Sequence, residues 1–178
     1  MSLNVPLLSR RLLDPDGDAA LIHSWVVEDR ATFWMMQDHT VDEVRAIYTW
    51  IDEQPTHHAW LVHSDDDPVA LFQDYDPAAE EVGEHYDVQP GDLGVHFMVR
   101  PGRARLVLPF LMREVFADPD VRRVIAEPDS RNQRSLALVD KLGFERGPEI
   151  ELSTKPAQLV FFTREAYGRS AFSNQHLA

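Results

Sequence analysis

The sequence predicts an α/β domain built around a mixed β-sheet. Segments with strand and helix patterns alternate in the order β-α-α-β-β-β-α-β-α-β-β, which is typical of this class. The 178 residues suit one domain, and no repeat, low-complexity block or long linker divides them. We therefore expect a single domain over residues 1–167 and a flexible polar tail over residues 168–178.

A turn separates the first predicted strand from the first predicted helix. Residues 5–13 have an extended pattern, and Pro-Asp-Gly-Asp at residues 15–18 is a turn sequence. Asp18 is placed to cap a helix over residues 19–25, because a short acidic side chain can accept from the free N–H groups of a first turn.

The second predicted helix has a clear apolar face. Thr40 or Asp42 can cap its start, and Pro55 stops it. Its apolar residues recur at i, i+3, i+4 and i+7, and they are Val44, Ile47, Tyr48 and Ile51.

Strands dominate the middle of the chain and alternate with helices in its second half. Residues 59–63 and 69–75 predict a hairpin, and an acidic loop follows over residues 77–90. Beyond it we expect a strand over 93–99, a helix over 105–116, a strand over 123–127, a helix over 132–142 and a hairpin within 149–163. Gly143 suits the left-handed position after a helix.

The composition is acidic and lacks cysteine. A net charge of −13 repels nucleic acid and anionic membrane and favours small cationic partners, although the same acidity can serve only solubility. The absence of cysteine excludes disulfides, thiolate metal sites and a cysteine nucleophile, and it fits a reducing cytoplasm. No apolar run is long enough to span a membrane, so a soluble, cytoplasmic protein is expected. The histidines and the Asp-Asp-Asp turn have no metal-ligand spacing, so we expect no metal.

A basic turn joins the strand at 93–99 to the helix that follows. Arg100, Gly102, Arg103 and Arg105 lie where free N–H groups and the positive end of the helix dipole meet, an arrangement that suits a phosphate. Basic residues are conspicuous in a chain of this acidity. The alternative is an ordinary solvated turn.

Two titratable residues occupy positions that suit chemistry. His96 lies on an alternating strand, and Asp129 follows a strand and precedes a helix, where open α/β sheets gather ligands. Each also has a structural interpretation, His96 as a satisfied strand histidine and Asp129 as a helix cap.

Several motifs resemble one branch of the GNAT N-acetyltransferases. These are Asp-x-Gly-x-His at residues 92–96, Glu-Pro-Asp-x-x-Asn at 127–132, Gly-Phe at 143–144, Trp-Met-Met at 34–36 and Lys-Pro-Ala at 155–157. Together they resemble the lysine and hydroxylysine acyltransferases of mycobactin, aerobactin and desferrioxamine synthesis. The resemblance covers residues 5–165 and implies the GNAT (acyl-CoA N-acyltransferase) fold, a mixed central sheet flanked by helices on both faces.

The resemblance implies an acyl-CoA-dependent N-acyltransferase. Acetyl-CoA, or another acyl-CoA, would supply the acyl group, and a lysine-, ornithine- or cadaverine-like amine or hydroxylamine would receive it. His96 would be the general base, directly or through water, and Asp129 would orient or assist it. A primary amine has a pKa near 10.4, so only about one molecule in 10³–10⁴ is neutral at pH 7, and histidine suits the removal of that proton. The amine would attack the thioester directly, and strand N–H groups near Phe97 and Met98 could stabilise the oxyanion.

Further residues are predicted to line the site. The residues predicted to bind the cofactor are Phe97, Met98, Val99, Arg100, Gly102, Arg103, Ala104, Arg105, Asn132 and Ser135. Those predicted to bind the substrate are Trp34, Trp60, Tyr86, Asp92 and Lys155. Asn132 can instead cap the following helix, and the two tryptophans can instead be core aromatics.

The turn after His96 departs from the family pattern. GNAT proteins usually carry two or more glycines there, whereas this turn is short and has only Gly102. Two alternatives therefore stay open. One is an aminoglycoside or polyamine N-acetyltransferase, and the other is a non-catalytic GNAT-fold binding module with a degenerate CoA loop.

Overall fold

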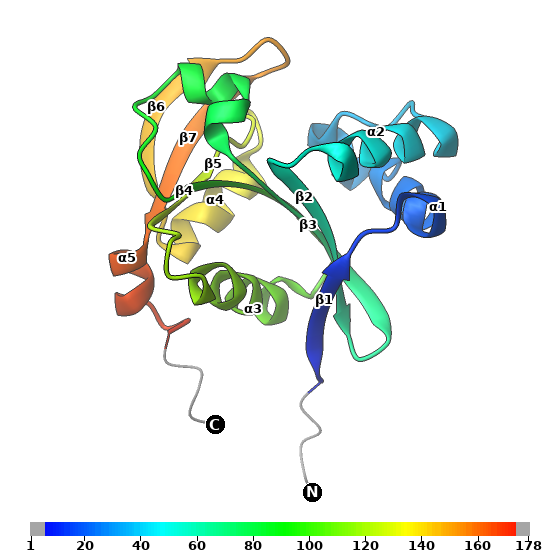
Figure 1. Ribbon diagram of the computed structural model, residues 1–178, viewed down its shortest axis with the longest axis horizontal. Helices are drawn as coiled ribbons and strands as arrows, with labels where there is room; N and C mark the ends of the chain where they lie inside the picture. Colours follow the sequence, from blue (N-terminus) through cyan, green and yellow to red (C-terminus); the bar gives the residue numbers. More distant parts are fainter. Residues whose placement is uncertain (1–5, 174–178) are drawn as a thin grey trace, which may run out of the picture. The chain divides into compact units, whose positions relative to one another are not determined.

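A computed structural model describes residues 6–173 (Figure 1). Within this range the chain forms two compact units, the first from residues 6–74 and 96–107 and the second from residues 75–95 and 108–173. The prediction of one domain over residues 1–167 stays a prediction. The N-terminal end of the predicted first strand, at Val5, lies outside the described residues.

The elements follow the predicted order, with short 3₁₀ helices (η) and a terminal helix in addition. They are β1 Leu8–Leu12, α1 Pro15–Val26, η1 Asp29–Trp34, α2 Val41–Glu53, β2 His57–Ser64, β3 Asp67–Tyr75, η2 Pro77–Ala79, η3 Glu81–Glu84, β4 Asp92–Val99, α3 Ala104–Ala117, β5 Arg123–Ala126, α4 Gln133–Leu142, β6 Glu145–Glu151, β7 Pro156–Thr163 and α5 Arg164–Arg169.

The strands are hydrogen-bonded in the order β1-β2-β3-β4-β5-β7-β6. β4 and β5 are parallel, whereas β1–β2, β5–β7 and β6–β7 are antiparallel, so the predicted mixed sheet flanked by helices is confirmed. The β4–β5 pairing covers three positions, from Asp92↔Arg123 to Gly94↔Ile125. β4 then continues for five residues, whereas β5 continues for one.

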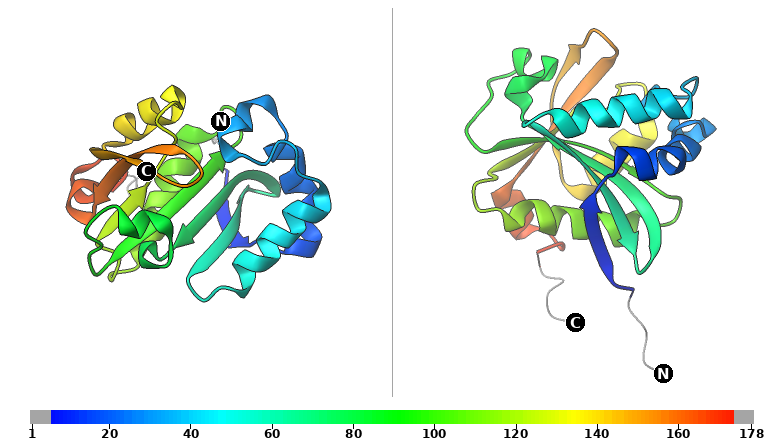
Figure 2. Two further views of the ribbon diagram at one scale, coloured as in Figure 1. Left: turned by 90° about the horizontal axis from the view of Figure 1, so that it is seen from above. Right: turned by 45° about the vertical axis from the view of Figure 1, so that its right-hand side comes forward.

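In the first unit, α1 and α2 lie side by side and cover the strands (Figure 2). The apolar stripe of α2 faces inward as predicted, with Val44, Tyr48 and Ile51 buried and Ile47 partly buried. Thr40 is the N-cap of this helix and forms a reciprocal capping box with Glu43.

The predicted start of the first helix is wrong. Helix α1 begins at Pro15, and Asp14 caps it by accepting from the N–H of Asp16. Proline is favoured in a first turn because its fixed φ suits the helix and no N–H is lost. Asp18 lies one turn inside, where its carboxylate accepts from both terminal nitrogens of Arg11 and from the N–H of Asp14.

In the second unit, aromatic residues join helices to the sheet. Phe116 of α3 and Phe144, which follows α4, both pack on Phe162 of β7. Gly143 ends α4 in the left-handed region at φ 88°, as expected. The predicted tail boundary at residue 168 falls inside α5, and residues 174–178 lie outside the described range.

Residues 6–173 contain no helix long and apolar enough to cross a bilayer. The same residues contain no group of three or more His, Asp or Glu side chains that could hold a metal ion.

Candidate functional site

In the first unit His96 belongs to a hydrogen-bonded series of side chains. Its Nδ1 lies 3.4 Å from Oε1 of Gln73 on β3, and Nε2 of Gln73 donates to Oη of Tyr48 on α2 at 3.1 Å. The Trp34 ring meets the His96 ring edge-on, with centroids 6.4 Å apart. The structure thus brings two predicted site residues, His96 and Trp34, together.

Trp60 belongs to the opposite face of the same strands. Its Nε1 donates to Asp74, which follows Gln73 on β3, and successive residues of a strand point to opposite faces. Arg10 lies over the Trp60 ring, 4.3 Å from its centroid, and His58 contacts the same Asp74 carboxylate. The structure does not bring Trp60 to His96, and its predicted contact with substrate stays a prediction.

The turn after β4 is braced by an arginine–glutamate cluster. Glu28 accepts from both Arg30 and Arg100, and these two arginines lower the pKa of its carboxyl, Arg100 most. Arg30 also donates to the carbonyl of Val99, the last residue of β4. The Nη2 atom of Arg30 is buried and has no hydrogen-bond partner among the described residues. The cluster fixes the strand end while leaving one donor unused.

The start of α3 offers further unused donors. The N–H groups of Gly102, Ala104 and Arg105 have no acceptor within residues 6–173, whereas that of Arg103 bonds to Arg100. Gly102 is left-handed at φ 77°, and a Cβ built on it would meet no atom within 4 Å. Arg103 and Arg105 are exposed, and Arg103 reaches Asp67 only at 3.5 Å. An open turn with free N–H groups and nearby guanidinium groups fits a phosphate or pyrophosphate.

The remaining predicted cofactor residues of β4 differ in exposure. Phe97 and Val99 are half-buried, whereas Met98 is buried in the core beneath α1 and α2. Any contact that Met98 makes with a cofactor would therefore come from its backbone, as the sequence prediction assumes.

In the second unit Asp129 is a buried, ionised carboxylate. It is 4% exposed and accepts from the backbone N–H and from Nε and Nη2 of Arg131. These hydrogen bonds, above all those from the Arg131 side chain, lower the pKa of Asp129 below its usual range. Its backbone carbonyl also accepts from Asn132.

Asn132, rather than Asp129, is the N-cap of α4. Its side-chain oxygen accepts from the N–H of Ser135 at 3.1 Å. The capping alternative for Asn132 is thus what the structure describes, and contact of Asn132 and Ser135 with cofactor stays a prediction.

Sequence reasoning missed a second buried carboxylate beside Asp129. Glu127 is 5% exposed and accepts from Oη of Tyr75 at 2.7 Å, and Nζ of Lys155 lies 3.9 Å from its other oxygen. Burial, followed by the Glu127 charge, raises the pKa of Tyr75, which stays neutral. The sequence did contain a signal for Glu127. This acidic residue directly follows a buried strand and lies two residues before Asp129, which is not the setting of an ordinary solvated loop residue. Lys155, a predicted substrate residue, thus lies within this carboxylate–phenol group.

Gly94 makes room for Tyr75, and its replacement should be costly. A Cβ at Gly94 would lie 2.2 Å from Cε2 and Cζ of the Tyr75 ring, which the bond to Glu127 holds in place. We expect Gly94→Ala to lower the free energy of unfolding by about 1–3 kcal/mol. Gly168→Ala is the matched control, because a Cβ there meets nothing within 4 Å. Equal stability of the two variants in urea denaturation would contradict this account.

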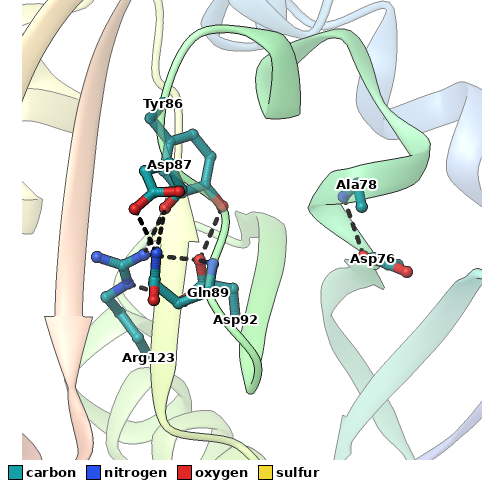
Figure 3. Close-up of polar contacts among 7 residues, drawn as sticks. All are labelled: Asp76, Ala78, Tyr86, Asp87, Gln89, Asp92 and Arg123. Atoms are coloured by element: carbon teal, nitrogen blue, oxygen red, sulfur yellow. Dashed lines mark hydrogen bonds and ion pairs between the residues drawn. The ribbon is translucent and has the colours of Figure 1, made fainter.

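Asp92 forms a buried ion pair with Arg123, and Tyr86 hydrogen-bonds to Asp92 (Figure 3). Arg123 donates to both oxygens of Asp92 at 2.7 Å, Oη of Tyr86 donates at 3.1 Å and the N–H of Gln89 at 2.9 Å. The Arg123 guanidinium also lies over the rings of Tyr86 and Phe161. Four donors occupy this carboxylate, so its evident role is to hold the loop before β4 against β5. The predicted contact of Asp92 and Tyr86 with substrate stays a prediction.

A family model and one curated relative match parts of this chain. Residues 14–152 match the model of a family described as acetyltransferase (GNAT) domain. A kanamycin resistance protein of Rhizobium radiobacter is 32% identical over 60 residues, which are 34% of this chain and 56% of that protein. The match therefore spans about half the length of this curated relative.

Solved structures share the fold at low sequence identity. An uncharacterized protein from Bacillus halodurans superposes with a TM-score of 0.86 at 22% identity, covering 94% of this chain and 89% of that one. The aminoglycoside acetyltransferase AAC(6')-Ib in complex with coenzyme A superposes with a TM-score of 0.79 at 21% identity, covering 92% and 99% of the two chains. The fold predicted from the sequence is confirmed.

Proposed function

The chain belongs to the acetyltransferase (GNAT) domain family, because residues 14–152 match the model of that family, and we propose that it transfers an acetyl group from acetyl-CoA to a small cationic amine. The class of enzyme and the acetyl-CoA cosubstrate follow the family and agree with the coenzyme A complex among the similar structures. The amine and the roles of individual residues are proposed below.

The open turn before α3 is the observation that carries the proposal. Its free N–H groups at Gly102, Ala104 and Arg105 suit the pyrophosphate of CoA, and Arg100, Arg103 and Arg105 supply positive charge. The chain carries a net charge of −13, so a site for a polyanion needs such a local concentration of arginine. The turn is short, but nothing fills the space beside Gly102.

In the proposed reaction His96 removes the proton that prevents the amine from reacting. The substrate N–H bond breaks as a nitrogen of the imidazole takes the proton, and the freed lone pair attacks the thioester carbonyl. The C–S bond then breaks, and the CoA sulfur leaves. A backbone N–H group near Phe97 and Met98 is proposed to stabilise the oxyanion between these steps. Asp129 is proposed to assist as an ionised carboxylate.

We further propose a lysine-, ornithine- or cadaverine-like amine, or its N-hydroxylated form, in hydroxamate siderophore synthesis. The support is the motif pair at residues 92–96 and 127–132, of which His96, Asp129 and the buried Glu127 are part. Aminoglycosides are the second candidate class, because the kanamycin resistance protein and the aminoglycoside acetyltransferase are both similar to this chain.

Calorimetry with acetyl-CoA tests the cosubstrate. We expect binding that the combined change of Arg100, Arg103 and Arg105 to alanine weakens by at least about 10-fold, because a hydrogen bond to a charged group contributes about 1.5–3 kcal/mol. Arg45→Ala is the control, since Arg45 lies on α2 and pairs with Asp16 and Asp42. A folded protein that binds no acetyl-CoA at millimolar concentration would instead favour the non-catalytic binding module.

An acetylation assay with a panel of amines tests the substrate class. Lysine, ornithine and cadaverine, each with and without N-hydroxylation, are compared with kanamycin and spermidine. A higher kcat/KM for the linear amines supports the first candidate. A higher value for kanamycin or spermidine would replace it with the second enzymatic alternative.

A further inference from the structure

We propose that Gln73 and Tyr48 are positioning residues that hold the His96 proton on Nδ1, so that Nε2 is the nitrogen that receives the proton of the amine. This inference rests on the proposed function, because it takes His96 as the base. Neither residue was predicted from the sequence to belong to the site.

Two contacts connect the buried core to the imidazole of His96. Tyr48 is 1% exposed and is held among the buried residues beneath α1 and α2. Gln73 donates from Nε2 to the phenol at 3.1 Å and presents Oε1 to Nδ1 of His96 at 3.4 Å. The second contact is long, as hydrogen bonds at catalytic groups often are before substrate binds.

The Gln73 amide bridges the phenol of Tyr48 and the imidazole of His96. Nε2 of Gln73 faces the phenol oxygen and donates to it, and the carbonyl oxygen of the same amide faces His96. Burial is the main cause that raises the pKa of Tyr48, so the phenol is neutral throughout the working range of pH. With Nε2 committed to Tyr48, only the carbonyl oxygen remains for His96.

A carbonyl oxygen can only accept, which decides the tautomer of the imidazole. The nitrogen that faces Gln73 must carry the proton, and in the neutral ring the other nitrogen then carries the lone pair. After Nε2 has taken a proton from the amine, Nδ1–H keeps the same hydrogen bond to Gln73. The ring need not turn during the reaction, and the edge-on contact with Trp34 limits turning.

Rigid elements support both positioning residues. Gln73 lies on β3, His96 on β4 and Tyr48 in the middle of α2, so each side chain is fixed by regular backbone. A partner that orients a metal-bound imidazole typically changes activity by about 10–100-fold when it is removed, and we expect a loss of that order here. That range sets the size of the effect to be measured.

Nitrogen NMR of the His96 ring tests the tautomer without any need for turnover. With ¹⁵N-labelled histidine, the wild-type protein should show a protonated Nδ1 and an unprotonated Nε2 when the ring is neutral. Gln73→Leu, which keeps the size of the side chain, should give a mixture of both tautomers. Tyr48→Phe should do the same more weakly, because the amide then loses the acceptor that orients it.

The pH profile of kcat/KM separates positioning from a structural role. Gln73→Leu should lower kcat by about 10-fold with little change in KM. Gln73→Glu should move the acidic limb upward by about one pH unit, because a carboxylate beside Nδ1 favours the imidazolium. A residue that served folding alone would change stability and leave this limb in place.

Two results would overturn the proposal. One is a wild-type ring protonated on Nε2, which would mean that the phenol donates to a Gln73 amide turned by 180°. The other is an unchanged tautomer in folded Gln73→Leu. Failure of the proposed function is a separate outcome: if no amine is acetylated, the NMR result still decides whether Gln73 sets the tautomer.

Discussion

Replacing His96 with alanine is expected to lower kcat by about 10²–10⁴-fold in the amine acetylation assay, the range contributed by a general base. The side chain is half-buried on β4 and packs edge-on against Trp34, so the change removes a proton acceptor and little of the core. The affinity for acetyl-CoA should change little, because the proposed phosphate site at residues 100–105 follows the strand.

The matched control for this experiment is His63→Ala. His63 is a half-buried strand histidine of the same unit, on β2, and it has no place in the proposed site. The control should keep the rate of the wild-type protein. A folded His96→Ala protein with the same rate would remove His96 from the mechanism and leave the acetyl-CoA site unaffected.

Replacing Arg123 with alanine is expected to lower the free energy of unfolding by about 3–5 kcal/mol. The Asp92 side chain is 1% exposed, and without Arg123 its charge would be left buried with only the Tyr86 hydroxyl and the Gln89 N–H. Urea denaturation would show the loss as a lower midpoint with a similar slope.

Two further variants make the Arg123 experiment specific. Arg122→Ala changes the exposed neighbouring arginine and should stay within about 0.5 kcal/mol of the wild-type protein. The double variant Asp92→Leu with Arg123→Met should recover most of the lost stability, because apolar residues of similar size can replace a buried pair. A double variant no more stable than Arg123→Ala would show that the loop before β4 depends on something other than this pair.

Local patterns explain why most of the fold could be predicted from the sequence. The i, i+3, i+4, i+7 spacing of α2 and the Gly143 stop after α4 depend on neighbouring residues, and both were confirmed. The start of α1 was predicted wrongly because Pro-Asp-Gly-Asp at residues 15–18 is a turn sequence, although a proline preceded by Asp14 is also a strong helix start. The six-residue helix α5 has too few residues for a periodic pattern.

The candidate site was less predictable because its contacts join distant parts of the chain. His96 and Trp34 could be named from motifs, but the partner of His96 is 23 residues away at Gln73, and the next partner is on α2. Arg123 and Asp92 are separated by 31 residues, so nothing local distinguishes Asp92 from a substrate-binding carboxylate. Glu127 could be recognised only as part of a motif, because Tyr75, which donates to it, lies 52 residues earlier.

The unused donors at the end of β4 and the start of α3 have a consequence for engineering the protein. The buried Nη2 of Arg30 and the N–H groups of Gly102, Ala104 and Arg105 each lack an acceptor among residues 6–173. A substitution that placed an internal acceptor there would raise the melting temperature and at the same time compete with an incoming phosphate. Selection for thermostability alone should therefore accumulate acidic or amide residues around this turn. The resulting proteins would be more stable and would bind acetyl-CoA less tightly.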